Sequence, residues 1–428
     1  MKRRDLLKGL AIAPFSERLR PDEQRQTSNT PPAGMRSDLS DVKTDPDWVL
    51  QVRGEMPVTR EVAYLQTASF GPSPVRVVSR VRELMEHQLK GPAVPVSARQ
   101  LQEAEDDCRP LVARFLGARQ EEVTLAHNTT EGLNIVLWSM DWKPGDEIIL
   151  SNQEHPALLI PSYNLLSRFK VNYRRASIDL NEDVVASVLK QVSPRTRLVA
   201  ISHVSRRSGR VIPARELASA LHSRGIRLLL DGAQAAGNIR FRFDDLGADY
   251  YSLCGHKWLL GPKGTAALLI RKDLLEKTPV SYTGAHSQKS YDEEGHLEWH
   301  PDGRRFEYGT RAQFNFGGFA EALRWLESIG TDEIFDRIQR LSLQAGMVIR
   351  SSKKFELASP LSDSERSGIV VVRLPAGSSG EEVFQKLAQL DRIVVSPLED
   401  PRNLRISLHF FNTWKEFETL MSRLDHYC

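Results

Sequence analysis

Several features are scarce in this 428-residue chain, and each scarcity excludes a class of protein. The three cysteines, Cys108, Cys254 and Cys428, provide neither a disulfide framework nor the paired spacing of a zinc site. No apolar run reaches the roughly 18 residues of a membrane-spanning helix. The formal net charge is only +3, so no strong field favours nucleic acid or an acidic membrane as a partner. What remains is an ordinary globular composition, with 40% hydrophobic and 26% charged residues.

The N-terminus carries a possible targeting signal. Arg3 and Arg4, followed by Asp-Leu-Leu-Lys, are similar to a bacterial twin-arginine (Tat) export signal. The apolar stretch behind them is short, and no small-residue cleavage site follows, so a basic tail in a cytoplasmic protein is the alternative. Export to the periplasm is the favoured interpretation. Because residues 20–45 are rich in Pro, Ser, Thr, Asp and Gln, we interpret residues 1–45 as a tail and linker.

Beyond residue 60, strand-length apolar runs alternate with helical patterns. The runs read EVTLA, DEIILS, RLVAISHV, RLLLD and TAALLIR, and several lack the polar alternation of a half-exposed strand. One helix is predicted to open at Ser73-Pro74 and end at Gly91, and another to run from Pro213 to Gly225. This βαβ series predicts an α/β fold with a mainly parallel sheet covered by helices on both faces.

A second, smaller α+β domain is predicted over residues 321–428, after a large domain over 46–320 whose first residues pack on the small one. A long helical stretch from Ala320 to about Lys353 leads into VVVRL, a helix from Glu381, RIVVS and LRISLHF. The last helix opens with Thr413 and Glu416 in capping-box spacing.

Sites in open α/β sheets collect at the carboxyl ends of the strands, so the loops after the strands are the places to search. Asp231 ends one apolar run, and His155 follows another. Thr129 and Thr130 stand where a helix begins, a position that suits a phosphate, although an ordinary threonine cap is the favoured explanation when the motif is taken alone. Lys257 lies among glycine, histidine and tryptophan in a largely apolar stretch, which is not a surface pattern.

An acid, a lysine, a histidine that can stack on a flat ring and a phosphate cradle together indicate one cofactor, pyridoxal 5'-phosphate. This cofactor needs a lysine amine for its Schiff base and an acid against its pyridine nitrogen. The negative charge of the acid favours the protonated ring nitrogen, which then withdraws electrons from the substrate.

The motifs Asp-Gly-Ala-Gln-Ala, Gly-Ala-Asp-Tyr-Tyr and Gly-His-Lys-Trp-Leu-x-Gly-Pro-Lys-Gly make residues 60–425 resemble the class V aminotransferase family, especially its isopenicillin N epimerase-like branch. The resemblance implies fold-type I, with a mainly parallel seven-stranded sheet in the large domain. It also implies that Lys257 forms the Schiff base and moves the proton at the substrate's α-carbon. Asp231 pairs with the pyridine nitrogen, Gln234 binds the phenolic oxygen and His155 stacks on the ring.

The same resemblance assigns the two ends of the ligand. Thr129, Thr130 and His256 hold the phosphate. Thr310, in Phe-Glu-Tyr-Gly-Thr, matches a loop that reaches the phosphate from a second subunit, which implies a homodimer with shared active sites. Arg405 matches the arginine that grips the substrate's α-carboxylate, a role suited to the planar guanidinium fork.

Three departures from the family pattern affect the reaction. Cys254 replaces a serine that helps to bind phosphate in desulfurase-type relatives, and Arg206 stands where relatives often have Asn or Tyr. Arg206 and Arg207 either read a second substrate carboxylate or are solvated loop charges, and the second interpretation is favoured. The stretch VVSPLEDPRN lacks the mobile cysteine that desulfurases need.

Three functions therefore remain open. The first is an aminotransferase or epimerase-like enzyme acting on an amino acid. The second is a carbon–sulfur lyase, or an enzyme that modifies a periplasmic peptide or siderophore. The third is a non-catalytic binding protein that keeps the fold, which the presence of Lys257, Asp231, His155 and Arg405 together disfavours.

Overall fold

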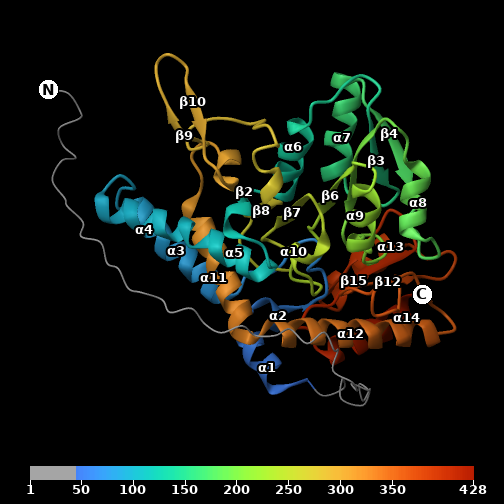
Figure 1. Ribbon diagram of the computed structural model, residues 1–428. Helices are drawn as coiled ribbons and strands as arrows, with labels where there is room; N and C mark the ends of the chain where they lie inside the picture. The colour runs from blue at the N-terminus through green and yellow to red at the C-terminus, as the bar shows by residue number, and fades with distance from the viewer. Residues whose placement is uncertain (1–44) are drawn as a thin grey trace, which may run out of the picture. The chain divides into compact units, whose positions relative to one another are not determined.

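The computed structural model describes residues 45–428, and a seven-stranded sheet forms its centre (Figure 1). In spatial order the strands are β2 (Val123–Ala126), β8 (Ala266–Ile270), β7 (Tyr250–Cys254), β6 (Arg227–Asp231), β5 (Thr196–Ser202), β3 (Glu147–Ser151) and β4 (Asn172–Ala176). Within this sheet, β8 runs against the other six strands. The predicted fold class, a mainly parallel seven-stranded sheet, is confirmed.

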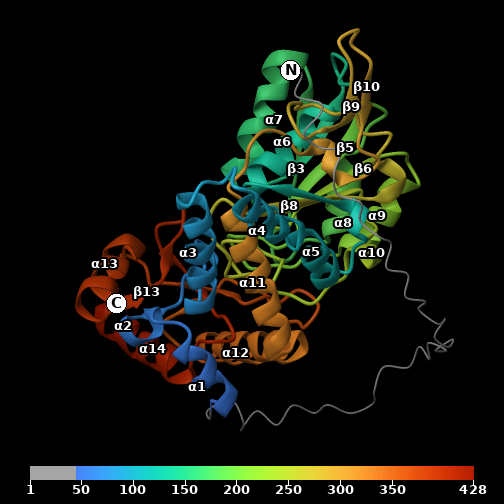
Figure 2. The same ribbon diagram turned by 90° about the vertical axis from the view of Figure 1, so that its left-hand side faces the viewer.

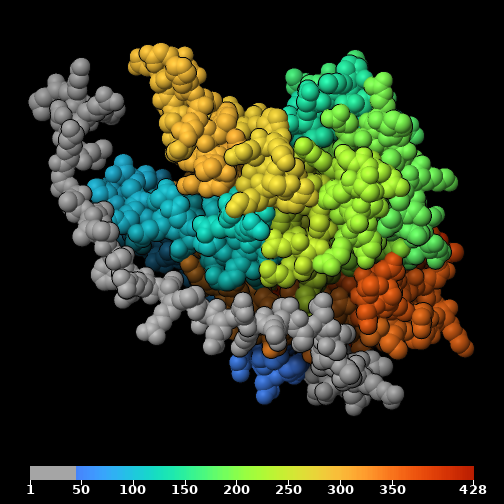
Figure 3. All heavy atoms as spheres, viewed as in Figure 1, coloured from blue at the N-terminus to red at the C-terminus, as the bar shows by residue number. Residues whose placement is uncertain are grey.

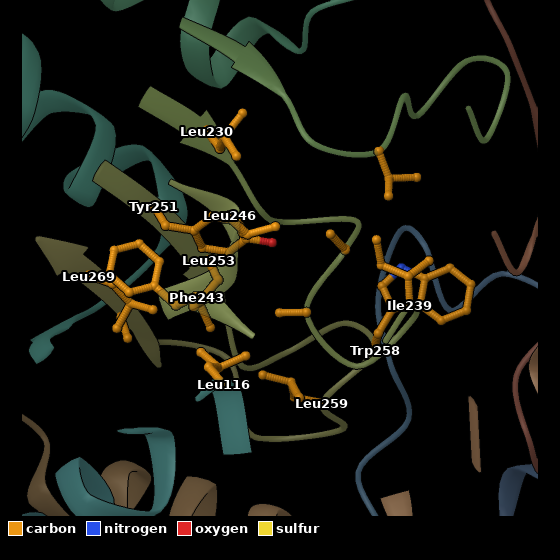
Figure 4. Packing of buried hydrophobic residues seen from close by; sticks show 14 of the residues in the cluster. Leu116, Leu230, Ile239, Phe243, Leu246, Tyr251, Leu253, Trp258, Leu259 and Leu269 are labelled. Carbon is orange, nitrogen blue, oxygen red and sulfur yellow. The ribbon is translucent and has the colours of Figure 1, made fainter. Parts of the chain in front are cut away.

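The apolar runs form buried strands because both faces of the sheet are covered. Along β6, Leu228 and Leu230 enter one hydrophobic core, and Leu229, between them, enters another. Figure 4 shows part of the first core, where Leu230 lies near Tyr251 and Leu253 of the neighbouring strand. A strand with two buried faces needs no polar alternation, which explains the continuous run RLLLD.

Helices from both sides supply these two cores. On one side are α6 (Thr129–Ser139) and α7 (Pro156–Phe169). On the other are α5 (Cys108–Leu116), α8 (Val184–Gln191), α9 (Ala214–His222) and α10 (Phe243–Leu246). Short 3₁₀ helices cover Gln120–Glu122, Lys272–Leu274 and Gly303–Phe306.

Strands β4 and β7 were missing from the apolar runs found in the sequence. β4 forms the edge of the sheet, and four of its five residues are exposed, so its pattern NYRRA carries no hydrophobic signal. β7 is buried, but two tyrosines, a serine and a cysteine make up most of it. It pairs parallel with β6 and antiparallel with β8, so the chain turns back sharply after Cys254.

Three further helices pack together beside the sheet: α3 (Val75–Leu89), α4 (Pro95–Asp106) and α11 (Gln313–Ile329). Figure 2 shows α3 and α11 side by side. The helical stretch predicted as one element from Ala320 is wrong in this detail, because Gly330 adopts a φ of 103° and separates α11 from α12 (Thr331–Ser351). That positive φ strongly favours glycine.

The C-terminal part has a second sheet and its own core. Its antiparallel strands, in spatial order, are β11 (Glu356–Leu357), β12 (Ile369–Arg373), β15 (Asn403–Ser407) and β14 (Ser396–Pro397). The helices α12, α13 (Gly380–Leu390) and α14 (Trp414–Tyr427) supply the rest of this part. The capping box of Thr413 and Glu416 at the start of α14 is present.

Residues before α3 lie against this C-terminal part. They form α1 (Asp47–Gly54), α2 (Val58–Glu61) and β1 (Ala63–Tyr64), and β1 pairs with β13 (Ile393–Val394). The predicted division at residue 320 falls inside α11. The twin-arginine segment and nearly all of the predicted linker lie outside the described residues.

A hairpin of β9 (Gln288–Tyr291) and β10 (Leu297–Trp299) projects from the region around the sheet, as the space-filling view shows (Figure 3). Within residues 45–428, no helix combines the length and the apolar character needed to cross a membrane.

Candidate active site

A cavity of about 760 Å³ lies where the carboxyl ends of β5, β6 and β7 meet the C-terminal part. Eight of the nine residues predicted for the site line it, namely Lys257, Asp231, Gln234, His155, Thr129, Thr130, His256 and Arg405. The strands bring them together because each loop begins at the same edge of a parallel sheet. The ninth residue, Thr310, lines a different cavity.

Asp231 is the last residue of β6 and is buried. Its Oδ1 accepts a hydrogen bond from the backbone N–H of Ala233 at 2.9 Å, which holds the carboxylate toward the cavity. Burial raises the pKa of Asp231, while the positive charge of Lys257 lowers it. A buried carboxylate opposite a cationic ligand atom would be stabilised as the anion.

Lys257 lies on the loop that joins β7 to β8. Gly255 N–H donates to the Thr265 carbonyl at 2.8 Å, and Gly261 N–H donates to the Gly255 carbonyl at 2.8 Å. Leu260 takes a φ of 57°, a left-handed conformation that is uncommon for a bulky residue. The fold thus holds this loop in one strained, closed conformation, a feature that clusters at functional sites.

Gly71 is the closest neighbour of this loop. Its N–H donates to the His256 carbonyl at 2.7 Å. A Cβ atom built on Gly71 would lie 2.0 Å from the Lys257 carbonyl oxygen, so no larger residue fits without moving the backbone. The segment before α3 therefore packs directly on the lysine loop.

The N-terminus of α6 forms one end of the cavity. Asn128 caps the helix by accepting from the Glu131 N–H at 3.0 Å, and this leaves the threonines that follow free of the capping role. The buried Oγ1 of Thr129 has no hydrogen-bonding partner, and neither has the buried Nδ1 of His256. The first N–H groups of a helix, with unpaired hydroxyl and imidazole groups beside them, suit an anion such as phosphate.

His155 caps α7 with its ring, since Nδ1 accepts from the Ala157 N–H at 3.0 Å. Burial, together with the charges of Lys257 and Arg206, lowers the pKa of His155 to about 4. The imidazole is therefore neutral at physiological pH, and Nε2 carries its proton. A neutral ring with a fixed orientation is suited to stacking.

Glu154, beside His155, is buried and was not singled out in the sequence. Its Oε2 accepts from the Ser202 hydroxyl at 2.6 Å and from the Ser202 N–H at 3.0 Å, and Oε1 accepts from Ser151. Burial raises the pKa of Glu154 to about 6. These bonds hold together the carboxyl ends of β3 and β5.

Gln234 has both ends of its amide fixed. Its Nε2 donates to the Ala68 carbonyl at 2.8 Å, and its Oε1 accepts from the Trp258 indole at 2.9 Å. These two bonds do not use the second N–H of the amide, which can donate to a ligand oxygen. The predicted contact of Gln234 with the phenolic oxygen stays a prediction.

Arg405, on β15, is only 4% exposed. Its Nη2 donates to the Ser69 hydroxyl at 2.6 Å and its Nη1 to the Arg206 carbonyl at 3.3 Å, while its Nε has no partner. Burial and the charge of Arg206 lower its pKa to about 10. Among the described residues no carboxylate forms an ion pair with Arg405, although the charge of Glu399 acts on it and raises its pKa.

Arg206 and Arg207 differ although they are adjacent. The side chain of Arg206 is 14% exposed, lines the cavity and pairs with Glu399, so the interpretation as a solvated loop charge is wrong for it. The Arg207 side chain is 40% exposed and lines a separate cavity. Its Nε lies 3.6 Å from the other oxygen of Glu399.

Thr310 is exposed in a cavity that also contains Arg109, Glu307 and Arg311. Glu307 is buried, and its Oε2 accepts from Nη2 of Arg109 at 3.0 Å and of Arg311 at 2.7 Å. Within one chain, Thr310 therefore does not join the other predicted site residues.

The sequence reasoning missed Ser69, Gly71 and Glu399. Ser69 and Gly71 belong to a loop, ASFGPSP, whose turn residues say nothing about a distant site. Glu399 lies in the stretch VVSPLEDPRN, which stands out in the sequence only because it lacks a cysteine.

Comparisons with known proteins agree with this geometry. The family model described as aminotransferase class-V matches residues 63–420. The isopenicillin N epimerase of Streptomyces clavuligerus is 30% identical over 89% of this chain and 98% of its own length. A probable cysteine desulfurase of Staphylococcus aureus is 28% identical over 74% of this chain and 77% of its own length. A solved complex of the cystine C–S lyase C-DES with cysteine persulfide is 27% identical, with a TM-score of 0.82, and covers 87% of this chain and 99% of its own.

Proposed function

We propose, from the premise that this chain belongs to the class-V aminotransferase family and uses pyridoxal phosphate, that it acts at the α-carbon of an amino-acid substrate by transamination or epimerisation. The observation that carries the proposal is the unpaired Arg405 in the same cavity as Lys257 and Asp231. An enzyme of this kind needs a carboxylate grip within reach of its lysine.

The residues present fit the cofactor. The unpaired Thr129 hydroxyl and His256 imidazole stand at the N-terminus of α6, where the phosphate would bind. Asp231 supplies the buried acid at the far end of the same cavity, and His155 supplies a neutral ring on its wall. These donors and acceptors match the chemistry of a phosphorylated, protonated pyridine.

Bound pyridoxal phosphate supplies an electron sink for charge at the substrate's α-carbon. Within this framework, Asp231 keeps the pyridine nitrogen protonated. Lys257 would hold the cofactor through its amine and would take the proton from the substrate's α-carbon. Arg405 orients the substrate through its carboxylate, and the burial of Arg405 excludes the water that would otherwise compete for that carboxylate.

A carbon–sulfur lyase is the second candidate, and the likeness to the cystine C–S lyase favours it. Desulfuration through a cysteine on the cavity loop has no support, because Ser396, Pro397, Leu398, Glu399 and Pro401 line the cavity there. A lyase that expels a sulfur leaving group from its substrate needs no such cysteine.

We also propose that the active enzyme is a homodimer. Thr310 is exposed and lies outside the Lys257 cavity of its own chain. In the proposed dimer it reaches the phosphate end of the partner's cavity, where Thr129 lacks a partner. Sedimentation of the purified protein tests this arrangement, and a monomer with full activity would contradict it.

The decisive experiment is a visible absorption spectrum of the cofactor-loaded protein before and after a panel of amino acids. Bleaching that a keto acid reverses supports transamination, whereas racemised substrate with little bleaching supports epimerisation. Release of pyruvate and ammonia supports the lyase.

Lys257→Ala is expected to abolish both the covalently bound absorption and turnover. Lys263→Ala is the matched control, because Lys263 belongs to the same loop but does not line the cavity; its Nζ lies 4.4 Å from the centre of the Phe70 ring. A coloured, active Lys257→Ala variant would contradict the proposed function.

A further inference from the structure

Two arginines, Arg405 and Arg206, line the cavity, and of its three carboxylates, Asp231, Glu381 and Glu399, only Glu399 forms an ion pair with either arginine. Arg405 lies on β15, and Arg206 lies on the loop after β5. They are close enough for Nη1 of Arg405 to donate to the Arg206 carbonyl at 3.3 Å, and the charge of Arg206 helps to lower the pKa of Arg405. Glu399 pairs with Arg206 and acts on Arg405 only through its charge, without a direct ion pair.

Glu399 is the most exposed member of this group. Its side chain is 49% exposed, and it lies on the turn between β14 and β15. Arg207 stands on its other side, with Nε 3.6 Å from Oε2, and lines the neighbouring cavity. Glu399 can therefore leave Arg206 and remain paired with Arg207.

Arg206 cannot follow it outward as easily. Its side chain is 14% exposed, and its Nε is buried without a hydrogen-bond partner. A guanidinium with a free Nε and an Nη that is bound to a displaceable acid offers the two-pronged edge that a carboxylate recognises. Arg206 lines the same cavity as Arg405.

Resting on the proposed function, we infer that the substrate is an acidic amino acid, whose side-chain anion displaces Glu399 from Arg206 while Arg405 holds the α-carboxylate. A neutral side chain would leave the Arg206–Glu399 pair intact and gain nothing from it. A cationic side chain would meet two arginines in a buried space, where like charges repel strongly.

The test compares isosteric ligands on the cofactor-loaded enzyme. The spectral titration uses glutamate against glutamine and aspartate against asparagine. Calorimetry with glutarate against butyrate, which lack an amine, measures anion binding independently of turnover. We expect the acid of each pair to bind at least about tenfold more tightly, the worth of one charge-assisted hydrogen bond.

Three variants assign the effect. Arg206→Gln is expected to remove the preference for acids and leave the affinity for alanine within about twofold. Glu399→Gln is expected to increase the preference, because the competing carboxylate is gone; this exposed position also guards against a folding failure of the buried variant. Arg402→Gln removes a positive charge near the same turn from a residue that does not line the cavity, and it should retain the preference.

If the acid and the neutral ligand of each pair bound with equal affinity, and if Glu399→Gln left their affinities equal, the inference would be overturned while the proposed function would stand. The inference would also be overturned if free lysine or arginine bound more tightly than the acidic amino acids and if Glu399→Gln abolished that preference. A cofactor spectrum that no amino acid changes would contradict the proposed function instead; the glutarate calorimetry then decides the inference, since equal binding of glutarate and butyrate overturns it.

Discussion

Replacing Gly71 by alanine is expected to displace the lysine loop, although the change adds only one methyl group. The new Cβ would lie 2.0 Å from the Lys257 carbonyl oxygen, 2.9 Å from its carbon and 3.0 Å from a methyl group of Leu260. Folded proteins do not tolerate such contacts below 3.0 Å, so the two backbones must separate by about 1 Å. Because the first two contacts are with backbone atoms, no rotamer change relieves them.

The displacement sets the expected magnitudes. Overpacking of this kind costs about 1–3 kcal/mol of unfolding free energy. A catalytic group misplaced by about 1 Å loses on the order of a hundredfold in rate. Gly71→Ala should therefore lower the denaturation midpoint modestly but lower kcat/KM about a hundredfold, because the displaced backbone is that of Lys257 itself.

Urea denaturation followed by circular dichroism, and steady-state kinetics on the loaded enzyme, measure the two effects. Gly54→Ala is the matched control, because a Cβ at Gly54 meets nothing within 4 Å and its φ is not positive. Gly54, at the end of α1, should accept alanine with unchanged activity. If Gly71→Ala were as active as Gly54→Ala, the close packing of the Gly71 segment on the lysine loop would not contribute to catalysis.

The remaining predictions concern the ligand and the pH. Arg405→Ala should raise KM for the amino acid at least about tenfold through loss of a charge-assisted bond, with an unchanged cofactor spectrum; equal loss of cofactor would make Arg405 structural. Thr129→Val should weaken cofactor binding about tenfold in a fluorescence titration, yet leave the stability of the cofactor-free protein nearly unchanged, because its Oγ1 has only the Cys254 thiol, a weak hydrogen-bonding group, beside it. Burial lowers the pKa of His203 and of His409 to about 4. Between about pH 6.5 and 4 these imidazoles therefore stay neutral in the folded state, whereas in the unfolded chain they bind protons. Stability should accordingly be full above pH 6.5 and decline as the pH falls toward 4, by about 3 kcal/mol for each histidine; a denaturation midpoint that stays constant across this range would contradict the assignment.

The fold was largely predictable because its strands are buried on both faces. The runs RLLLD and DEIILS are recognisable as buried strands from their hydrophobicity alone. Because the two strands are parallel, the loops that follow them lie at the same edge of the sheet. β4 escaped notice because an edge strand can be polar. The break at Gly330 escaped it because the apolar spacing continues on both sides, and a single glycine inside a helical pattern is tolerated in many helices.

The candidate site was predictable where function and a local motif coincide. Asp231 ends β6 and His155 follows β3, so their convergence could be expected. Lys257 follows β7, which was missing from the apolar runs, and the motif around it marked it instead. Ser69 and Glu399 reach the same cavity only through tertiary packing, and nothing in their own surroundings marks them. Arg206 was ambiguous because its charge and loop position suit solvent equally well; burial, which a sequence does not display, separates it from Arg207.

The segment from β1 to Gly71 has a consequence for how the enzyme can be divided. β1 pairs with β13, Ser69 accepts from Arg405, and Gly71 donates to the lysine loop. A fragment that begins at residue 72 would keep every residue named from the sequence motifs, yet it would lose one of the connections between the substrate's arginine and the cofactor's lysine. The contact of His409 with the Trp258 carbonyl would remain. The catalytic unit is therefore discontinuous along the chain, and truncation guided by motifs alone would yield a protein with a complete set of catalytic side chains that lacks part of the framework that positions them.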